Sequence, residues 1–139
     1  MKLLLAVDGS EHSKRAVKYV LSHWRDDPAA AITVLNVDPP LMRRVANALG
    51  REDIDRYHAD NAEAALRYAR TSFKRAGIAI DHKAVVGDPA AVITRTATQG
   101  KYDLVVMGSH GRGVFGNLLL GSVVTKVLSG CQVPVLIVR

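Results

Sequence analysis

The sequence is poor in cysteine, in aromatic residues and in long apolar runs. Its single cysteine, Cys131, cannot form a disulfide within the chain, and aromatic residues make up 5% of the 139 residues. The apolar run near the N-terminus ends at Asp8, which is too early for a signal peptide. No segment reaches the roughly eighteen apolar residues of a membrane-spanning helix. We therefore expect one soluble cytoplasmic domain over residues 1–139, with one hydrophobic core.

Acidic residues are absent from the C-terminal part of the chain. From Leu104 to Arg139 there is no Asp or Glu, whereas Arg112, Lys126 and Arg139 are basic. A segment without carboxylates does not repel a polyphosphate, so an anionic ligand is the favoured partner of this part of the sequence.

The net charge of +6 also raises the question of nucleic acid. Four cations, Arg67, Arg70, Lys74 and Arg75, lie near the end of a predicted helix, where they favour the negative end of its dipole. Few aromatic residues are present to stack on bases. We therefore do not expect nucleic acid to be a partner, and we expect no membrane binding.

A glycine-rich stretch follows the apolar run of residues 104–107. It has five glycines within fourteen residues, at positions 108, 111, 113, 116 and 121, and a helical pattern begins after it. Glycine allows backbone N–H groups to approach a bound group closely, and Ser122 suits the N-cap of the helix. A strand, a glycine loop and a helix N-terminus predict a phosphate site, although many glycine-rich loops are simply long turns.

Two better-known phosphate motifs do not fit this sequence. Residues 111–116 match G-x-G-x-x-G, but a dinucleotide fold has that motif after its first strand, with an acidic residue about twenty positions later. A P-loop needs Gly-Lys followed by Ser or Thr, whereas Gly100-Lys101 is followed by Tyr102. We set both motifs aside.

Strand and helix patterns alternate along the whole chain. Apolar or alternating runs predict strands over residues 2–7, 31–37, 78–86, 103–107 and 133–138. Helical spacing appears over residues 16–24, 51–76, 89–97 and 122–130, with Asp88 as an N-cap and Pro89 at the first helical position. This order predicts an α/β fold with a parallel sheet, helices on both faces, and a ligand at the carboxyl ends of the strands.

Several residues have two interpretations. Residues 38–50 are too irregular to assign, and Arg43-Arg44 there belong to a solvated loop or cover the phosphates of a ligand. We expect Tyr57 and His58 to be packing residues rather than ligands, and His82 to be an ordinary strand residue. The apolar loop residues Val114, Phe115 and 118–120 are expected to pack against the domain; the alternatives are a cover over the phosphates or a contact with a partner.

The sequence resembles the nucleotide-binding universal stress proteins over essentially its whole length. The family pattern is Gly, two residues, Gly, nine residues, Gly and then Ser or Thr, which corresponds to Gly108, Gly111, Gly121 and Ser122. The segments 6–10, 87–89 and 133–138 also match. The resemblance departs at Asn36, where relatives often have histidine, and in the loop over residues 38–50.

The resemblance implies a sheet of order 3-2-1-4-5 and a site for ATP or AMP. With ATP we expect Mg²⁺, held mainly by the phosphates and through water by Asp8. The resemblance places Asp8 and Val37 on the adenine side and Gly87 near the ribose. The phosphate path would be lined by Met107, Gly108 and Gly111, and the phosphate oxygens held by Gly121, Ser122 and Val123. The further residues expected to bind the nucleotide are Ala6, Val7, His110 and Arg112. The resemblance also implies a homodimer formed by the last strand, Val133–Val138.

Two other functions remain as alternatives to an ATP-dependent stress or signalling module. An ATPase or phosphotransferase would use His110 or Asp8 as a base and Arg112 to stabilise charge, but no spacing places a nucleophile, so we expect slow hydrolysis at most and assign no catalytic residue. A receiver-type domain would need an acidic cluster after the first strand, where Asp8 stands alone. The sequence supplies no arranged metal site.

Overall fold

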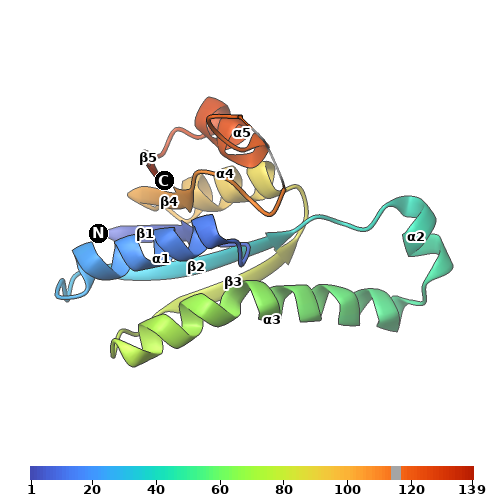
Figure 1. The fold of residues 1–139 in the computed structure, drawn as a ribbon, viewed down its shortest axis with the longest axis horizontal. Coiled ribbons are helices and arrows are strands. Elements are labelled where there is room, and N and C mark those ends of the chain that lie inside the picture. The colour runs from blue at the N-terminus through green and yellow to red at the C-terminus, as the bar shows by residue number, and fades with distance from the viewer. Residues whose placement is uncertain (114–116) are drawn as a thin grey trace.

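The fold is a five-stranded parallel sheet with helices on both faces, which confirms the fold class and the strand order (Figure 1). The computed structural model describes residues 1–113 and 117–139. The sheet order is β3-β2-β1-β4-β5. The strands are β1 (Lys2–Ala6), β2 (Ala31–Asp38), β3 (Asp81–Val86), β4 (Leu104–Gly108) and β5 (Val135–Val138). The helices are α1 (Glu11–Trp24), α2 (Arg43–Ala48), α3 (Arg51–Arg75), α4 (Pro89–Gln99) and α5 (Ser122–Gly130).

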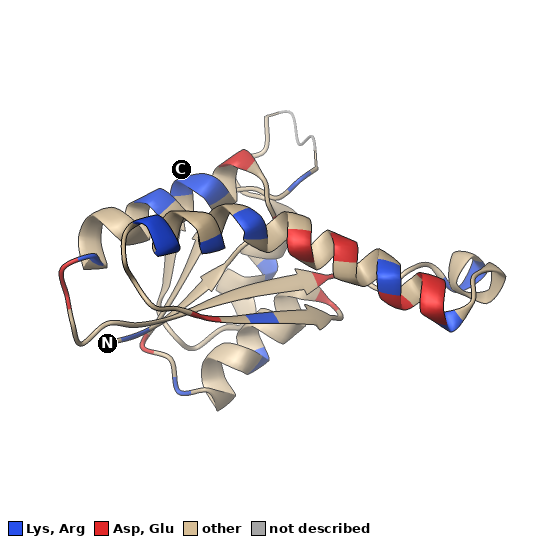
Figure 2. Cartoon of the chain, turned by 90° about the horizontal axis from the view of Figure 1, so that it is seen from below, with Lys and Arg blue, Asp and Glu red and all other residues tan. Residues whose placement is uncertain are grey.

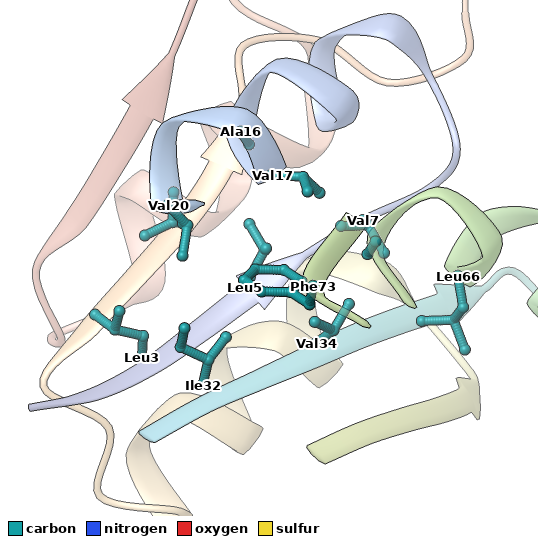
Figure 3. Packing of buried hydrophobic residues seen from close by; sticks show 12 residues of the cluster. Leu3, Leu5, Val7, Ala16, Val17, Val20, Ile32, Val34, Leu66 and Phe73 are labelled. Atoms are coloured by element: carbon teal, nitrogen blue, oxygen red, sulfur yellow. The ribbon is translucent and has the colours of Figure 1, made fainter. Parts of the chain in front are cut away.

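Two apolar clusters cover the two faces of the sheet. On one face α1 and α3 pack against the strands, with Phe73 of α3 fully buried beside Leu5 and Val34 (Figure 3). On the other face α4 and α5 pack against Leu4, Leu35 and neighbouring residues. The central strand β1 is buried on both faces, as its continuous apolar sequence predicts.

The helix ends follow their local sequences, with one exception. The Asp88 side chain accepts a hydrogen bond from Ala91 N at 2.9 Å, and Pro89 is at the first helical position, as predicted. Gly77 has φ 72° and follows the end of α3. Ser122 is not the N-cap of α5. Gly121 occupies that position with extended backbone, and Ser122 is the first helical residue.

Two strands are shorter than their apolar patterns. Residues 78–80 lie outside β3, because the pairing with β2 begins at Thr33 and Asp81, although Ile78 and Ile80 still pack against the core. β5 begins at Val135, after Pro134, which lacks an N–H group. The unassigned segment 38–50 contains the short helix α2, in which Arg43 and Arg44 are exposed.

Helix α2 and the first part of α3 project away from the sheet (Figure 1). Figure 2 shows acidic residues mainly along the projecting part of α3, and Lys and Arg mainly along α1 and the rest of α3. On α3, Glu63 lies 3.9 Å from Arg67 and 3.0 Å from Arg70. Over residues 1–113 and 117–139, no helix is both long enough and apolar enough to cross a membrane.

Candidate functional site

A cavity of about 270 Å³ lies where the carboxyl ends of β1, β2 and β4 meet. This is where a ligand is expected in an open parallel α/β sheet. The loop after β4 and the N-terminus of α5 form one end of the cavity, and the end of β2 together with α3 forms the other. Because β1 separates β2 from β4 and strands are about 4.8 Å apart, the two ends are roughly 10 Å from each other.

The N-terminus of α5 supplies the first end with backbone donors that have no partner among the described residues. The earliest backbone bond of this helix runs from Thr125 N to Gly121 O, at 3.0 Å. The N–H groups of Ser122, Val123 and Val124 precede that bond, and no side chain of the described residues caps the helix. These three residues line the cavity. A group with negative charge is the expected partner of such donors, because the helix dipole is positive at this end.

Two glycines beside the α5 end of the cavity leave room for neighbouring groups of different kinds. A methyl group on Gly108 would lie 2.5 Å from the backbone carbonyl carbon of His12, so glycine there lets β4 approach α1. A methyl group on Gly111 would lie 2.9 Å from Asp8 Oδ2. Glycine at position 111 therefore leaves room for the one carboxylate that lies beside the loop among the described residues.

A chain of polar contacts fixes the start of the glycine loop. The buried Ser109 places Oγ 3.2 Å from His12 Nδ1 and 3.0 Å from His110 Nδ1. His110 Nε2 lies 2.9 Å from the Leu118 carbonyl oxygen, so both ring nitrogens of His110 have partners. Gly121 N donates to the Ser109 carbonyl oxygen at 2.8 Å. These contacts join β4, the far side of the loop and the start of α5.

Asp8 and Arg112 meet at the middle of the cavity. Ser10 N donates to Asp8 Oδ1 at 2.9 Å, which fixes the carboxylate at the end of β1. Arg112 Nε donates to the Asp8 carbonyl oxygen, so the exposed Arg112 side chain crosses from the glycine loop to β1. The guanidinium group thus brings positive charge to a cavity that the sequence predicted for a phosphate.

The second end of the cavity contains a polar cluster that sequence reasoning missed. Asp38 Oδ2 lies 2.6 Å from His58 Nδ1 and accepts from Asn61 Nδ2 at 2.9 Å. Asp38 and Asn61 both line the cavity. His58 bonds the Asp38 carboxylate, a contact that its expected role as a packing residue did not include. Tyr57 is 44% exposed, contrary to the expectation that it packs. The sequence feature that could have pointed to this cluster was Asp38 itself, a carboxylate at the end of the otherwise apolar strand β2.

Asn36 is a second polar residue at this end. It is buried in the cavity wall, and its Nδ2 donates to the Val7 carbonyl oxygen at 2.9 Å. Its Oδ1 is buried and has no partner among the described residues. An amide at this position of β2 thus links two neighbouring strands but leaves one acceptor unmatched.

The structure brings most of the predicted site residues together around the cavity. Those that line it are Ala6 at the end of β1, Val7 and Asp8 after it, Val37 in β2, Met107, Gly108, His110, Gly111 and Arg112 in and after β4, and Ser122 and Val123 in α5. Gly87 and Gly121 do not line it. Their N–H groups donate to the carbonyl oxygens of Asp38 and Ser109, at 3.0 and 2.8 Å. Contact of any of these residues with a nucleotide stays a prediction.

The apolar loop is not packed as a whole. Leu118 and Leu119 are 60% and 66% exposed, contrary to the expectation that they pack, whereas Leu120 packs against the core. Val114 and Phe115 lie outside the described residues. Within the part of the chain that the structure covers, no group of three His, Cys, Asp or Glu side chains is placed to hold a metal ion.

Comparisons with known proteins agree with this architecture. The model of the universal stress protein family matches residues 1–139. A universal stress protein of Thermus aquaticus is 32% identical over 138 residues, which cover 99% of this chain and 97% of the relative. The solved structure of protein MJ0577 of Methanocaldococcus jannaschii is 26% identical, with a TM-score of 0.85 and coverage of 99% and 94%. A universal stress protein solved in complex with cAMP is 26% identical, with a TM-score of 0.72 and coverage of 100% and 97%.

Proposed function

The chain belongs to the universal stress protein family, and we propose that it is a nucleotide-dependent stress or signalling module that binds ATP or AMP in the cavity between β1, β2 and β4. The phosphates are held at the N-terminus of α5 and the base lies toward β2. Occupancy of the site orders the glycine loop and changes a surface that a partner protein recognises.

The observation that supports this proposal most strongly is the uncapped N-terminus of α5. The N–H groups of residues 122–124 have no partner in the part of the chain that the structure describes, and these residues line the same cavity as Arg112 and the glycine loop. Together these groups provide several donors and a positive charge for a phosphate, in a chain whose last 36 residues contain no carboxylate side chain. The relative solved with cAMP supports an adenine nucleotide as the ligand.

Mg²⁺ is part of the proposal when ATP is the ligand. Mg²⁺ commonly keeps several waters and is held by the phosphates together with one or two carboxylates. Asp8 fits this role, because its carboxylate lies beside Gly111 of the glycine loop. The ion would neutralise charge on the phosphates, while Ser10 N keeps the Asp8 carboxylate in place.

Rapid ATP hydrolysis is not favoured by the arrangement of His110. A general base needs a ring nitrogen that can accept a proton from the attacking group. Both nitrogens of His110 are already within 3.0 Å of partners, Ser109 Oγ and the Leu118 carbonyl oxygen. We therefore propose slow turnover at most, well below the roughly 1–100 per second that is typical of kinases.

We also propose that two copies associate through β5. This strand pairs only with β4 among the described strands, so one edge of it has unpaired backbone groups, and its residues are all partly exposed. Antiparallel pairing with a second copy would satisfy those groups. Sedimentation at increasing protein concentration should show a dimer, and a monomer at all concentrations would contradict this part of the proposal.

Calorimetric titration with ATP, AMP and cAMP tests the binding function, and Mg·ATP turnover tests the alternative. We expect saturable binding of at least one adenine nucleotide and weaker binding by Ser122→Ala. Removing the hydroxyl should cost no more than about 1.5–3 kcal/mol, the range for a hydrogen bond to a charged group. Absence of binding by all three nucleotides would contradict the proposal, and sustained turnover at kinase-like rates would favour the ATPase.

A further inference from the structure

A second groove, which we call the β3 groove, lies between α3 and the edge strand β3. Its cations on α3 are Arg67, Arg70 and Lys74, and β3 contributes His82. The three α3 cations are spaced by three and four residues, which places them on one face of the helix. The groove contains one carboxylate, that of Glu63. With His82 neutral, three cations and one carboxylate leave the groove with a net charge of +2.

The helix dipole does not account for all three cations. Basic residues are favoured in the last turn of a helix, and the effect falls off beyond that turn. Because α3 ends at Arg75, Lys74 lies in the last turn, whereas Arg67 lies about two turns earlier. Glu63 contacts Arg67 and Arg70, but Lys74 forms no ion pair within residues 1–113 and 117–139. The groove therefore has more positive charge than its own carboxylate neutralises.

The strand beside these cations has an open edge. Among the described strands β3 pairs with β2 alone, so the backbone N–H and C=O groups on its other side have no strand partner. Five of the six residues of β3 are exposed, whereas those of β5 at the opposite edge are all partly buried. Figure 1 shows β3 at the edge of the sheet, next to α3. An edge of this kind is a template for one more strand.

A strand added beside β3 would bring its side chains to the cations of the groove. His82 lines the groove and Ile80 packs against the core, so every second residue from 80 onward faces α3. Arg67 and Lys74 are seven residues apart, which is about 10 Å along the helix. Alternate side chains of a strand are about 6.6 Å apart. Two alternate side chains of the added strand therefore fit within the length of the three cations.

We propose that the β3 groove is a docking site for an extended acidic segment of a partner protein. The segment adds to the sheet beside β3 and places carboxylates at alternate positions against Arg67, Arg70 and Lys74. The site lies outside the nucleotide cavity, and docking does not require that the cavity be occupied. The inference thus goes beyond the proposed function and names the chemistry of a partner.

Charge and backbone chemistry favour this occupant over two others. Pairing of the β3 edges of two copies of this chain would bring two basic grooves together, and like charges that face each other destabilise a sheet. Nucleic acid would match the charge, but the described residues that line the groove include no Phe, Tyr or Trp on which bases could stack. The backbone groups of the β3 edge match a peptide strand.

Fluorescence anisotropy with a labelled octapeptide tests the docking site. Threonine and glutamate alternate in this peptide, because threonine favours strands and glutamate supplies the carboxylates. We expect saturable binding to the wild-type protein at low salt, and weaker binding as salt is added, because exposed charge pairs are screened. A peptide with glutamine in place of glutamate loses several charge pairs and should bind about 10-fold more weakly or worse. No saturable binding of the glutamate peptide at low salt would overturn the inference.

A charge reversal in the groove tests where the peptide binds. Lys74→Glu removes one attraction and adds one repulsion, so the affinity for the peptide should fall by about 3- to 30-fold. Lys18→Glu, the same change at an exposed position of α1, is the matched control and should bind like the wild-type protein. Thermal unfolding checks that both variants are folded. Equal affinities of the two folded variants would overturn the inference.

N-methylation of the peptide tests strand addition apart from charge. The backbone N–H groups of an added strand point alternately toward β3 and toward solvent. One peptide is methylated at the threonine nitrogens and another at the glutamate nitrogens, so that each lacks one of the two sets. We expect one methylated peptide to lose binding and the other to keep it. Equal binding of the two peptides, whether kept or lost, would overturn the addition of a strand.

Two further titrations separate this inference from nucleic acid binding and from the proposed function. A labelled pentathymidylate has four phosphates, which match the four glutamates of the peptide. If it binds more tightly than the peptide and Lys74→Glu weakens it, nucleic acid replaces the acidic segment as the occupant and the inference is overturned. The peptide titrations contain no nucleotide, and ATP binding is measured separately on the same samples. Failure of peptide docking therefore leaves nucleotide binding intact, and failure of ATP binding leaves the docking site intact.

Discussion

Replacing Ser122 by proline removes one backbone donor from the proposed phosphate site and leaves the helix intact. Proline has no N–H group but fits the first position of a helix, where the N–H has no partner within the helix. Ser122 occupies that position in α5, and the preceding Gly121 has φ −71° and ψ 162°, which a residue before proline can adopt. The fold already has a proline at this position of α4, Pro89.

The expected loss of affinity follows from the number of contacts removed. Ser122→Ala removes the hydroxyl and keeps the N–H, whereas Ser122→Pro removes both. Each hydrogen bond to a charged phosphate contributes about 1.5–3 kcal/mol, so the proline variant should bind ATP about 10- to 100-fold more weakly than the alanine variant. Stability should change little, because the N–H at the first helical position has no partner within residues 1–113 and 117–139.

Calorimetric titration with ATP measures the difference, and thermal unfolding checks the fold. The matched control is Glu11→Pro, which places proline at the first position of α1 after Ser10, whose φ −68° and ψ 162° are nearly those of Gly121. This control should bind ATP like the wild-type protein. If Ser122→Pro and Ser122→Ala bind ATP equally well, the N–H of Ser122 does not contact the ligand and the placement of the phosphates is refuted.

Two further predictions concern the packing that builds the site. Gly108→Ala should lower the free energy of unfolding by about 1–3 kcal/mol, because its methyl group would lie 2.5 Å from the His12 backbone. Gly130→Ala is the control, because nothing lies within 4 Å of the added methyl group. This variant should leave the free energy of unfolding unchanged or raise it by up to about 1 kcal/mol. Urea unfolding measures both variants, and a ranking in the opposite order would contradict the geometry. Phe73→Ala should lower the free energy of unfolding by about 3–5 kcal/mol in the same assay, because the ring is fully buried between α3 and the sheet. A decrease below about 1 kcal/mol would show that the ring is not packed there.

The sequence predicted the sheet, and it predicted which residues gather at the glycine-loop end of the cavity, because both depend on local patterns. The continuous apolar run of β1 and the proline after Asp88 determine their elements without distant partners. The glycine spacing after β4 could be recognised in the same way. The cap of α5 was misplaced by one residue, since Gly121 and Ser122 both suit an N-cap and the backbone angles decide between them.

The other end of the cavity could not be predicted because it depends on contacts between distant residues. Asp38 and His58 are separated by 20 residues and meet only because α3 packs against β2. Helical spacing assigned His58 to the same face as the packing residues, which was correct for its position on the helix and gave no information about its partner. The exposure of Asp81–Lys83 also depends on distant parts of the chain, because β3 is the edge strand of the sheet and the strand order puts it there.

The central claim is that an adenine nucleotide binds with its phosphates at the N-terminus of α5. A titration of ¹⁵N-labelled protein with ATP, followed by amide chemical shifts, tests it most directly, because it reports on individual N–H groups. We predict that the amides of Ser122, Val123 and Val124 shift strongly and saturate together with those of the glycine loop. Saturable shifts elsewhere, with these three amides unchanged, would contradict the account.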